Sequence, residues 1–105
     1  HAAAAGHVIL PYCSHVNDRR FSPGGGFVQA ADFSRYAIGA INWLLQEPGP
    51  KMLSIGLHLR IIGRPGRMQA LADILAHVAA TPGIWVAPRR EIAAHWLKRA
   101  QEPPR

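Results

Sequence analysis

The histidine at position 58 stands where a polar side chain in a folded protein can do chemistry. It directly follows an apolar run at 52–57, and glycine and proline residues bound the surrounding stretch. Such a run is typical of a strand that is buried on both faces of a parallel sheet. Ligands of these sheets gather at the carboxyl ends of the strands, which is where His58 falls. An imidazole there can protonate a departing nitrogen as a general acid, and the alternative is a histidine that is only hydrogen-bonded within the sheet.

A basic loop follows His58 and supplies residues that can hold a substrate. Arg64 and Arg67 lie in this loop beside Gly63 and Gly66, which allow a tight backbone path. The guanidinium group matches planar oxygen pairs, so these two arginines can clamp a carboxylate or a ureido group. Alternatively, Arg67 is an early residue of the helix that follows.

Apolar runs and helical patterns alternate along the chain and would position these residues. Strands are expected at 7–12, 52–59 and 84–87, and helices from about 32 to 47, 67 to 80 and 91 to 101. We expect Asp32 to be the N-cap of the first helix. The alternation predicts an α/β fold of three consecutive βα units with parallel strands. The three tryptophans fall on apolar faces and are expected in the core, namely Trp43, Trp85 and Trp96.

Length and charge narrow the class of protein. A chain of 105 residues is expected to form a single domain, 1–105. The formal net charge is +6, but the 12 Lys and Arg residues are spread along the chain. Because the sequence also lacks the known nucleic-acid-binding motifs, we do not expect a nucleic-acid partner. A basic site for a small anionic or carbonyl-rich molecule explains the arginines equally well.

Membrane insertion and disulfide formation are not expected from the sequence. It contains no apolar run of about 18 residues, the length that a membrane-spanning helix needs. Its one cysteine, Cys13, cannot form an internal disulfide, and this fits a reducing, cytoplasmic location. Cys13 is interpreted as a buried or incidental thiol, with a nucleophile as the alternative.

Two motifs of the chain resemble a known family. The segment SIGLH at 54–58 followed by GRPGR at 63–67 is similar to the last sequence block of the polysaccharide-deacetylase-like (NodB-homology) hydrolases, and most of all to their urate-catabolism allantoinase-like branch. The resemblance extends from about His7 to Gln101. It implies the C-terminal part of a deformed (β/α) barrel whose N-terminal half is absent from this chain. It also implies a catalytic role for His58, because the family places a catalytic histidine at the end of a late strand.

A second segment of the same family is matched by PYCSHVND at 11–18. In that segment the resemblance implies that Asp18 orients a catalytic group or holds a substrate N–H, and that Asn17 pairs with a carbonyl. The Arg-Phe pair that follows in relatives is matched by Arg20 and Phe21, which makes Arg20 a substrate-binding candidate. An acidic residue usually stands where this chain has His15, so no role is carried over to that position. The alternative for Asn17 and Asp18 is an Asx-type turn.

The reaction implied by this resemblance is hydrolysis of a non-peptide C–N bond in a cyclic amide, with allantoin as the expected small-molecule substrate and allantoate as the product. The general base and the rest of the pocket are expected in the N-terminal half, so a separate N-terminal half or a homo-oligomer is the expected partner. The alternatives are a fragment of a deacetylase acting on N-acetyl sugars, or an inactive or small basic α/β binding module.

A metal site is not expected from this chain alone. Deacetylases of the family commonly bind a divalent metal through an Asp and two His in earlier sequence blocks, so a metal is possible in the full barrel. The allantoinase-like branch is thought to work without one. The remaining histidines show no ligand spacing that we recognise, and they are His1, His7, His15, His77 and His95.

Overall fold

The computed structural model describes residues 2–3, 7–8, 10 and 13–101. The chain divides into two compact units, of which the first comprises His1–Pro11 and Trp85–Arg105 and the second comprises Tyr12–Ile84. Each unit is described by itself below. The single domain expected from the sequence stays a prediction.

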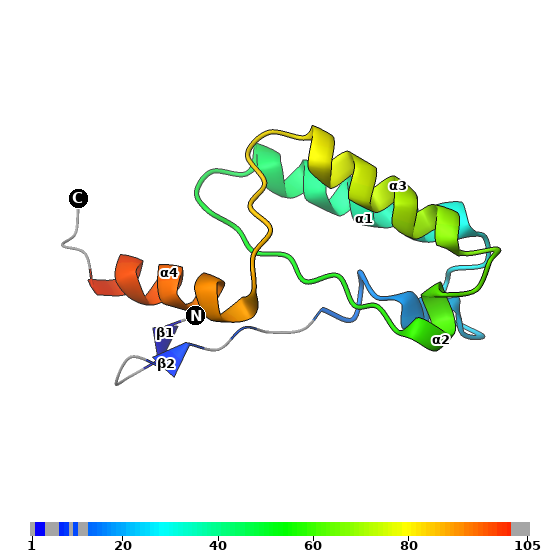
Figure 1. The fold of residues 1–105 in the computed structure, drawn as a ribbon, viewed down its shortest axis with the longest axis horizontal. Coiled ribbons are helices and arrows are strands. Elements are labelled where there is room, and N and C mark those ends of the chain that lie inside the picture. The colour runs from blue at the N-terminus through cyan, green and yellow to red at the C-terminus, as the bar shows by residue number, and fades with distance from the viewer. Residues whose placement is uncertain (1, 4–6, 9, 11–12, 102–105) are drawn as a thin grey trace. The chain divides into compact units, whose positions relative to one another are not determined.

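Two long helices lie side by side in the second unit (Figure 1). These are α1 (Ala30–Gln46) and α3 (Met68–Ala80), which pack against each other along their lengths. Two short helical segments complete the unit, the 3-10 helix η2 (Asp18–Phe21) and α2 (Leu59–Ile62), and these also pack against each other. The predictions of helices at about 32–47 and 67–80 are confirmed to within two residues at each end.

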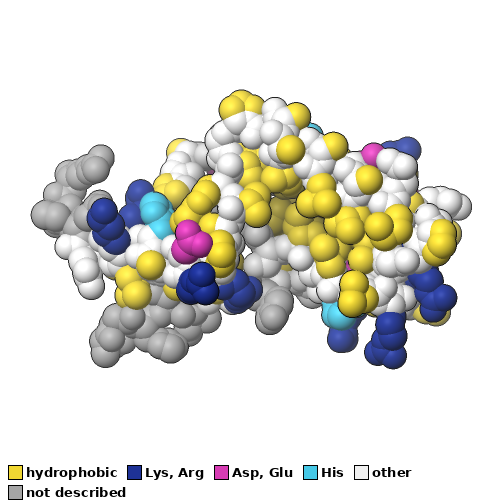
Figure 2. Space-filling model, viewed as in Figure 1, with side chains coloured by type: hydrophobic (Ala, Val, Ile, Leu, Met, Phe, Trp, Pro, Cys, Tyr) yellow, Lys and Arg dark blue, Asp and Glu magenta, His cyan; other side chains and the backbone are white. Residues whose placement is uncertain are grey.

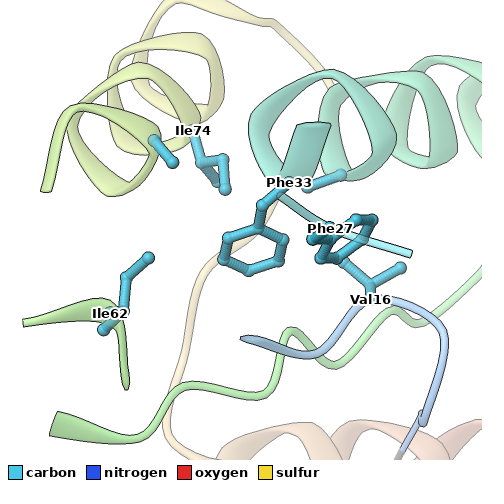
Figure 3. Close-up of a cluster of buried hydrophobic side chains, with 7 residues drawn as sticks. Val16, Phe27, Phe33, Ile62 and Ile74 are labelled. Carbon is cyan, nitrogen blue, oxygen red and sulfur yellow. The ribbon is translucent and has the colours of Figure 1, made fainter. Parts of the chain in front are cut away.

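Phenylalanine side chains fill the centre of the second unit (Figure 3). Phe33 is 0% exposed, and its ring centroid lies 5.5 Å from that of Phe27 and 5.9 Å from that of Phe21. Aliphatic side chains from both long helices, from α2 and from the first loop close this cluster, namely Val16, Ala37, Ile62, Ala70 and Ile74. The core therefore ties the loop that carries η2 to the helices, and this fixes the position of Asp18.

The first turn of α1 differs from the prediction in one detail. Gln29, and not Asp32, is the N-cap, and Asp32 lies at the third position of the helix. The carboxylate of Asp32 turns back and accepts hydrogen bonds from the backbone N–H groups of Val28 at 2.9 Å and Gln29 at 2.8 Å. A carboxylate can satisfy the free N–H groups of a helix start from this position as well as from the cap, which is why the helix begins earlier than expected.

The predicted parallel strands are not confirmed, although the first of them, expected at 7–12, is a strand at His7–Val8. Among the described residues the strands are β1 (Ala2–Ala3) and β2 (His7–Val8), and they pair antiparallel. The stretch at 52–58 makes a single parallel bridge, between Gly56 and Asn17, and 84–87 has no regular secondary structure. A parallel strand needs a hydrogen-bonded neighbour along its length. Among the described residues, 52–58 has one such bridge and 84–87 has none. The end of the first expected strand, at 11–12, lies outside the described residues.

The first unit contains β1, β2 and α4 (Arg89–Gln101), so the helix expected at 91–101 is confirmed. None of the described residues of α4 is buried. The ring of His95 lies 5.5 Å from that of Trp85 and 5.9 Å from that of Trp96, edge to face in both cases. Aromatic edge-to-face contacts therefore replace the buried core that was expected for these tryptophans.

The prediction of core tryptophans is wrong. Trp43 and Trp85 are exposed and Trp96 is half-buried. A helical hydrophobic pattern marks an apolar face, but a side chain on that face is buried only where another element covers it. Figure 2 shows hydrophobic side chains on the surface of the second unit, where Leu59 is 91% exposed.

Within the described part of the chain, no helix has both the length and the apolar character needed to cross a membrane.

Replacing Phe33 with alanine should destabilise the second unit strongly. The substitution removes a fully buried ring and leaves a cavity, which typically costs about 3–5 kcal/mol of unfolding free energy. Urea unfolding followed by circular dichroism measures the change. The matched control is Val28→Ala at a side chain that is 80% exposed, where a change within about 0.5 kcal/mol is expected. Equal effects of the two substitutions would contradict the position of the core.

The pKa of Asp32 makes stability depend on acid pH. The backbone N–H of Val28, followed by that of Gln29, holds this pKa below its ordinary value of 3.8. Folding therefore favours the ionised carboxylate, whose contribution is complete above pH 3.8 and is lost as the pH falls through the lowered pKa of the folded chain. Thermal unfolding of Asp32→Asn should show a lower midpoint at neutral pH, and the difference from the natural chain should shrink in acid. Asp73→Asn, on α3, is the control and should keep the acid dependence of the natural chain.

Candidate active site

Backbone hydrogen bonds bring two distant segments of the second unit together. The N–H of Gly56 donates to the carbonyl of Val16 at 2.9 Å, and the N–H of Asp18 donates to the carbonyl of Gly56, also at 2.9 Å. These two bonds form the parallel bridge between Asn17 and Gly56. They bring Asp18, at the start of η2, close to His58, which precedes α2.

Gly56 is required at this bridge for a steric reason. A Cβ atom added at Gly56 would collide with the side-chain amide of Asn17. That amide is itself held in place, because its oxygen accepts a hydrogen bond from the backbone N–H of Arg19 at 2.9 Å. Asn17 thus forms the N-cap of η2, the local turn that the sequence left open as an alternative to carbonyl binding.

Asp18 and His58 form the closest polar pair of the site. The Asp18 side chain is 0% exposed, and its two oxygens have separate partners on the same residue. Its Oδ1 lies 2.6 Å from Nδ1 of His58, and its Oδ2 accepts the backbone N–H of His58 at 2.6 Å. A buried carboxylate needs such partners, and this one fixes both the backbone and the ring of the histidine. The His58 side chain remains 39% exposed.

The exposed ring nitrogen of His58 faces Arg19. The Nε group of Arg19 donates to Nε2 of His58 at 3.3 Å, so Asp18 and Arg19 hold the two ring nitrogens from opposite sides. Arg19 is not among the residues predicted from the sequence. Its only signal was a place next to Asp18 in the arginine pair at 19–20, and the Arg-Phe pattern directed attention to Arg20 instead.

The three arginines predicted to bind substrate have other contacts in the structure. Arg20 donates from Nε to the carbonyl of Gly25 at 2.8 Å, and its guanidinium carbon lies 4.2 Å from the ring centroid of Phe27. Arg67 donates to the carbonyl of Ile61 at 3.2 Å, and its guanidinium carbon lies 4.5 Å from the ring centroid of Phe21.

Arg64 differs from these two because its side chain is exposed. Its Nε group donates to the carbonyl of Arg60, one helical turn earlier in the chain, at 3.2 Å. Figure 2 shows Lys and Arg side chains gathered around the end of the unit where Figure 1 places α2. The structure therefore brings Asn17, Asp18 and His58 together, and substrate binding by Arg20, Arg64 and Arg67 stays a prediction.

The described residues contain no group of three or more His, Cys, Asp or Glu side chains arranged to hold a metal ion. Cys13 and His15 form one close pair of such side chains, with their Sγ and Nδ1 atoms 3.7 Å apart. Two ligands do not satisfy the four-ligand coordination that structural zinc sites in proteins have. The metal content of a complete barrel stays a prediction.

Comparison with known proteins finds relatives that match most of this chain. "Putative polysaccharide deacetylase" of Schizosaccharomyces pombe (strain 972 / ATCC 24843) is 42% identical over 94 residues, which are 87% of this chain and 29% of that protein. The crystal structure of a probable polysaccharide deacetylase from Pseudomonas aeruginosa PAO1 matches with a TM-score of 0.82 and 40% identity, over 90% of this chain and 32% of that one.

A further solved structure, that of the PuuE allantoinase, matches with a TM-score of 0.80 and 40% identity, over 91% of this chain and 32% of that one. No protein-family model matches the chain.

These comparisons show that the chain is similar to deacetylase-type proteins. They confirm its resemblance to the polysaccharide-deacetylase-like family, with the allantoinase-like branch among the matched members. The chain spans about a third of the length of these relatives. The deacetylase-type architecture is thus supported by the structural neighbours, and the three βα units are not.

Substituting Gly56 with alanine should disturb the candidate site. Because the added Cβ would meet the amide of Asn17, either that side chain or the bridge at Gly56 must shift. We expect the NMR signals of the His58 ring and of the Asp18 backbone to move, and the midpoint of thermal unfolding to fall. Gly39→Ala is the matched control, since nothing lies within 4 Å of its added Cβ and α1 gains a better helix former. An unchanged His58 spectrum in Gly56→Ala would show that the bridge does not position the histidine.

Proposed function

We propose that this chain supplies the Asp18–His58 part of the active site of a deacetylase-type hydrolase that cleaves C–N bonds in small molecules. The observation that carries the proposal is the buried Asp18 carboxylate, which holds His58 through both its backbone N–H and its Nδ1 atom. A histidine fixed in this way on one ring nitrogen presents the other to a reactant, the arrangement by which a carboxylate orients a catalytic imidazole. The family resemblance supports the same assignment.

In the proposed reaction, water adds to a carbonyl carbon, the C–N bond breaks, and the departing nitrogen takes a proton. His58, in its protonated form, gives that proton from Nε2 as the general acid. Asp18 stabilises the imidazolium and keeps the ring in place. Asp18 does not itself reach the substrate, because its side chain is fully buried and both oxygens are engaged by His58.

Allantoin is the proposed substrate, and hydrolysis of its ring amide would give allantoate. The similarity to the PuuE allantoinase supports this choice. The arginine beside His58 also suits a ligand rich in ureido oxygens. Removal of an acetyl group from an N-acetyl sugar is the second candidate, because two of the relatives are named as polysaccharide deacetylases. Both reactions hydrolyse an amide and both use a general acid.

The rest of the site is proposed to come from residues outside this chain. The relatives are about three times as long as the part that this chain matches. The stretch at 52–58 has one bridge, and the nearby side chains of Leu57 and Leu59 are exposed, as expected of a surface that further barrel strands would cover. We therefore propose that a complementing N-terminal half, or a second copy of the chain, supplies the general base.

The experiment measures hydrolysis of allantoin and of N-acetylglucosamine by the 105-residue chain, alone and with a complementing N-terminal half. We expect allantoin turnover in the combined sample. His58→Ala and Asp18→Asn should each lower kcat by about 10²- to 10⁴-fold, the usual contribution of a general acid. In Asp18→Asn, kcat would fall because the His58 ring is no longer held in its orientation.

The matched control is His77→Ala, which removes a histidine of α3 whose Nε2 atom lies 2.8 Å from the side-chain oxygen of Asn42, outside the site. Its kcat should stay close to that of the natural chain. Turnover of the N-acetyl sugar alone would replace the allantoinase proposal with the deacetylase one. The proposal would be refuted if a folded His58→Ala chain kept full activity, or if neither substrate were turned over by the combined sample.

A further inference from the structure

The hydrogen-bonding groups around His58 determine which of its ring nitrogens carries hydrogen. The Nε group of arginine is always a donor, because guanidinium has no acceptor atom. Nε2 of His58, 3.3 Å from Nε of Arg19, must therefore present its lone pair. Nδ1, 2.6 Å from the Asp18 carboxylate, must then carry the hydrogen. With both contacts in place, the ring of His58 is the Nδ1–H tautomer.

This state cannot perform the proposed reaction while Arg19 stays in place. A general acid must carry hydrogen on the nitrogen that faces the leaving group, and here Nε2 is occupied as an acceptor. The hydrogen bond from Arg19 must therefore break before His58 can take up a proton at Nε2. Whatever draws Arg19 away controls whether His58 can act.

Arg19 is free to make that move, in contrast to its neighbour. Arg20 is held by the carbonyls of Gly25 and His15 and lies over the rings of Phe27 and Tyr36. Arg19 is exposed, and among the residues that the structure describes its guanidinium hydrogen-bonds with His58 alone. Its two terminal nitrogens remain available as a pair of parallel donors, the geometry that suits a carboxylate or ureido group.

We propose that Arg19 is the substrate-positioning residue of this site, and that a planar oxygen-bearing group of the substrate draws it from Nε2 of His58. The proposal rests on the proposed function, which it deepens by naming the group that the substrate must present. Binding of that group then releases Nε2 at the moment when the leaving nitrogen is beside it. Substrate recognition and the readiness of the acid would in this way depend on one side chain.

The first test observes His58 directly and requires no turnover. Long-range proton–nitrogen NMR of the 105-residue chain at neutral pH should show His58 as the Nδ1–H tautomer, with Nε2 unprotonated. In Arg19→Met the Nε2 signal should move to the position of a nitrogen without a donor, whereas Arg35→Met, at an exposed arginine of α1, should leave it unchanged. A hydrogen on Nε2 in the natural chain, or an Nε2 signal that Arg19→Met does not move, would overturn the proposal.

The second test asks whether a ligand moves Arg19. Allantoin added to the natural chain should shift the Nε2 signal, and added to Arg19→Met it should do so far less. In the combined sample used for turnover, Arg19→Met should raise KM about 10- to 100-fold, the worth of a hydrogen bond to a charged group, and Arg19→Lys should recover part of it. An Nε2 signal that does not respond to allantoin would overturn the positioning role.

The two proposals fail in different ways. If the Nε2 signal behaves as expected but no sample hydrolyses either amide, the proposed function is wrong and the assignment of Arg19 as a ligand-positioning residue stands. If allantoin is hydrolysed and His58→Ala is inactive, but Arg19→Met has a normal KM and an unchanged Nε2 signal, the proposed function stands and Arg19 has no positioning role.

Discussion

The buried carboxylate of Asp18 is the constraint on which the candidate site depends. A carboxylate removed from water must recover its hydrogen bonds within the protein, since a buried charge without partners costs several kcal/mol. Here both oxygens are satisfied by His58, 40 residues along the chain, through its backbone N–H and its ring. The pair therefore does two things at once. It closes the loop between η2 and α2, and it fixes the ring whose other nitrogen faces Arg19.

Packing around this pair explains how so small a unit can hold it. Phe33 joins the first loop to the two long helices, and Ile62 joins α2 to the same cluster. The hydrogen bonds between Val16, Gly56 and Asp18 then bring the two site segments into register. Much of the apolar surface beyond this cluster is exposed, and the extended stretch at 52–58 has one bridge. The chain spans about a third of the length of the relatives that it matches.

The arginines of the unit divide by their contacts into two kinds. Arg20 and Arg67 lie over phenylalanine rings and donate to backbone carbonyls, and a guanidinium held in this way stabilises the loop around it. Arg19 and Arg64 are exposed, and Arg19 alone touches the histidine. Arginines that lie close together in a sequence can thus make different kinds of contact. Arg19 and Arg20 are neighbours in η2, yet Arg19 bonds to His58 and Arg20 to the carbonyl of Gly25.

The sequence by itself determined the three long helices, to within two residues at each end, and the family resemblance that singled out Asp18 and His58. Helices follow from local periodicity and from stop signals such as Pro48, so a single chain carries the information for them. The strands did not follow from the sequence, because an apolar run becomes a strand only where a neighbour completes its hydrogen bonds. Burial of Trp43 and Trp85 failed for the same reason, since an apolar face is covered only if another element packs on it. Tertiary structure alone decided that Arg19, and not Arg20, reaches Nε2 of His58. Adjacent residues of a turn point in different directions. Their order in the sequence does not show which of them meets a segment 39 residues away.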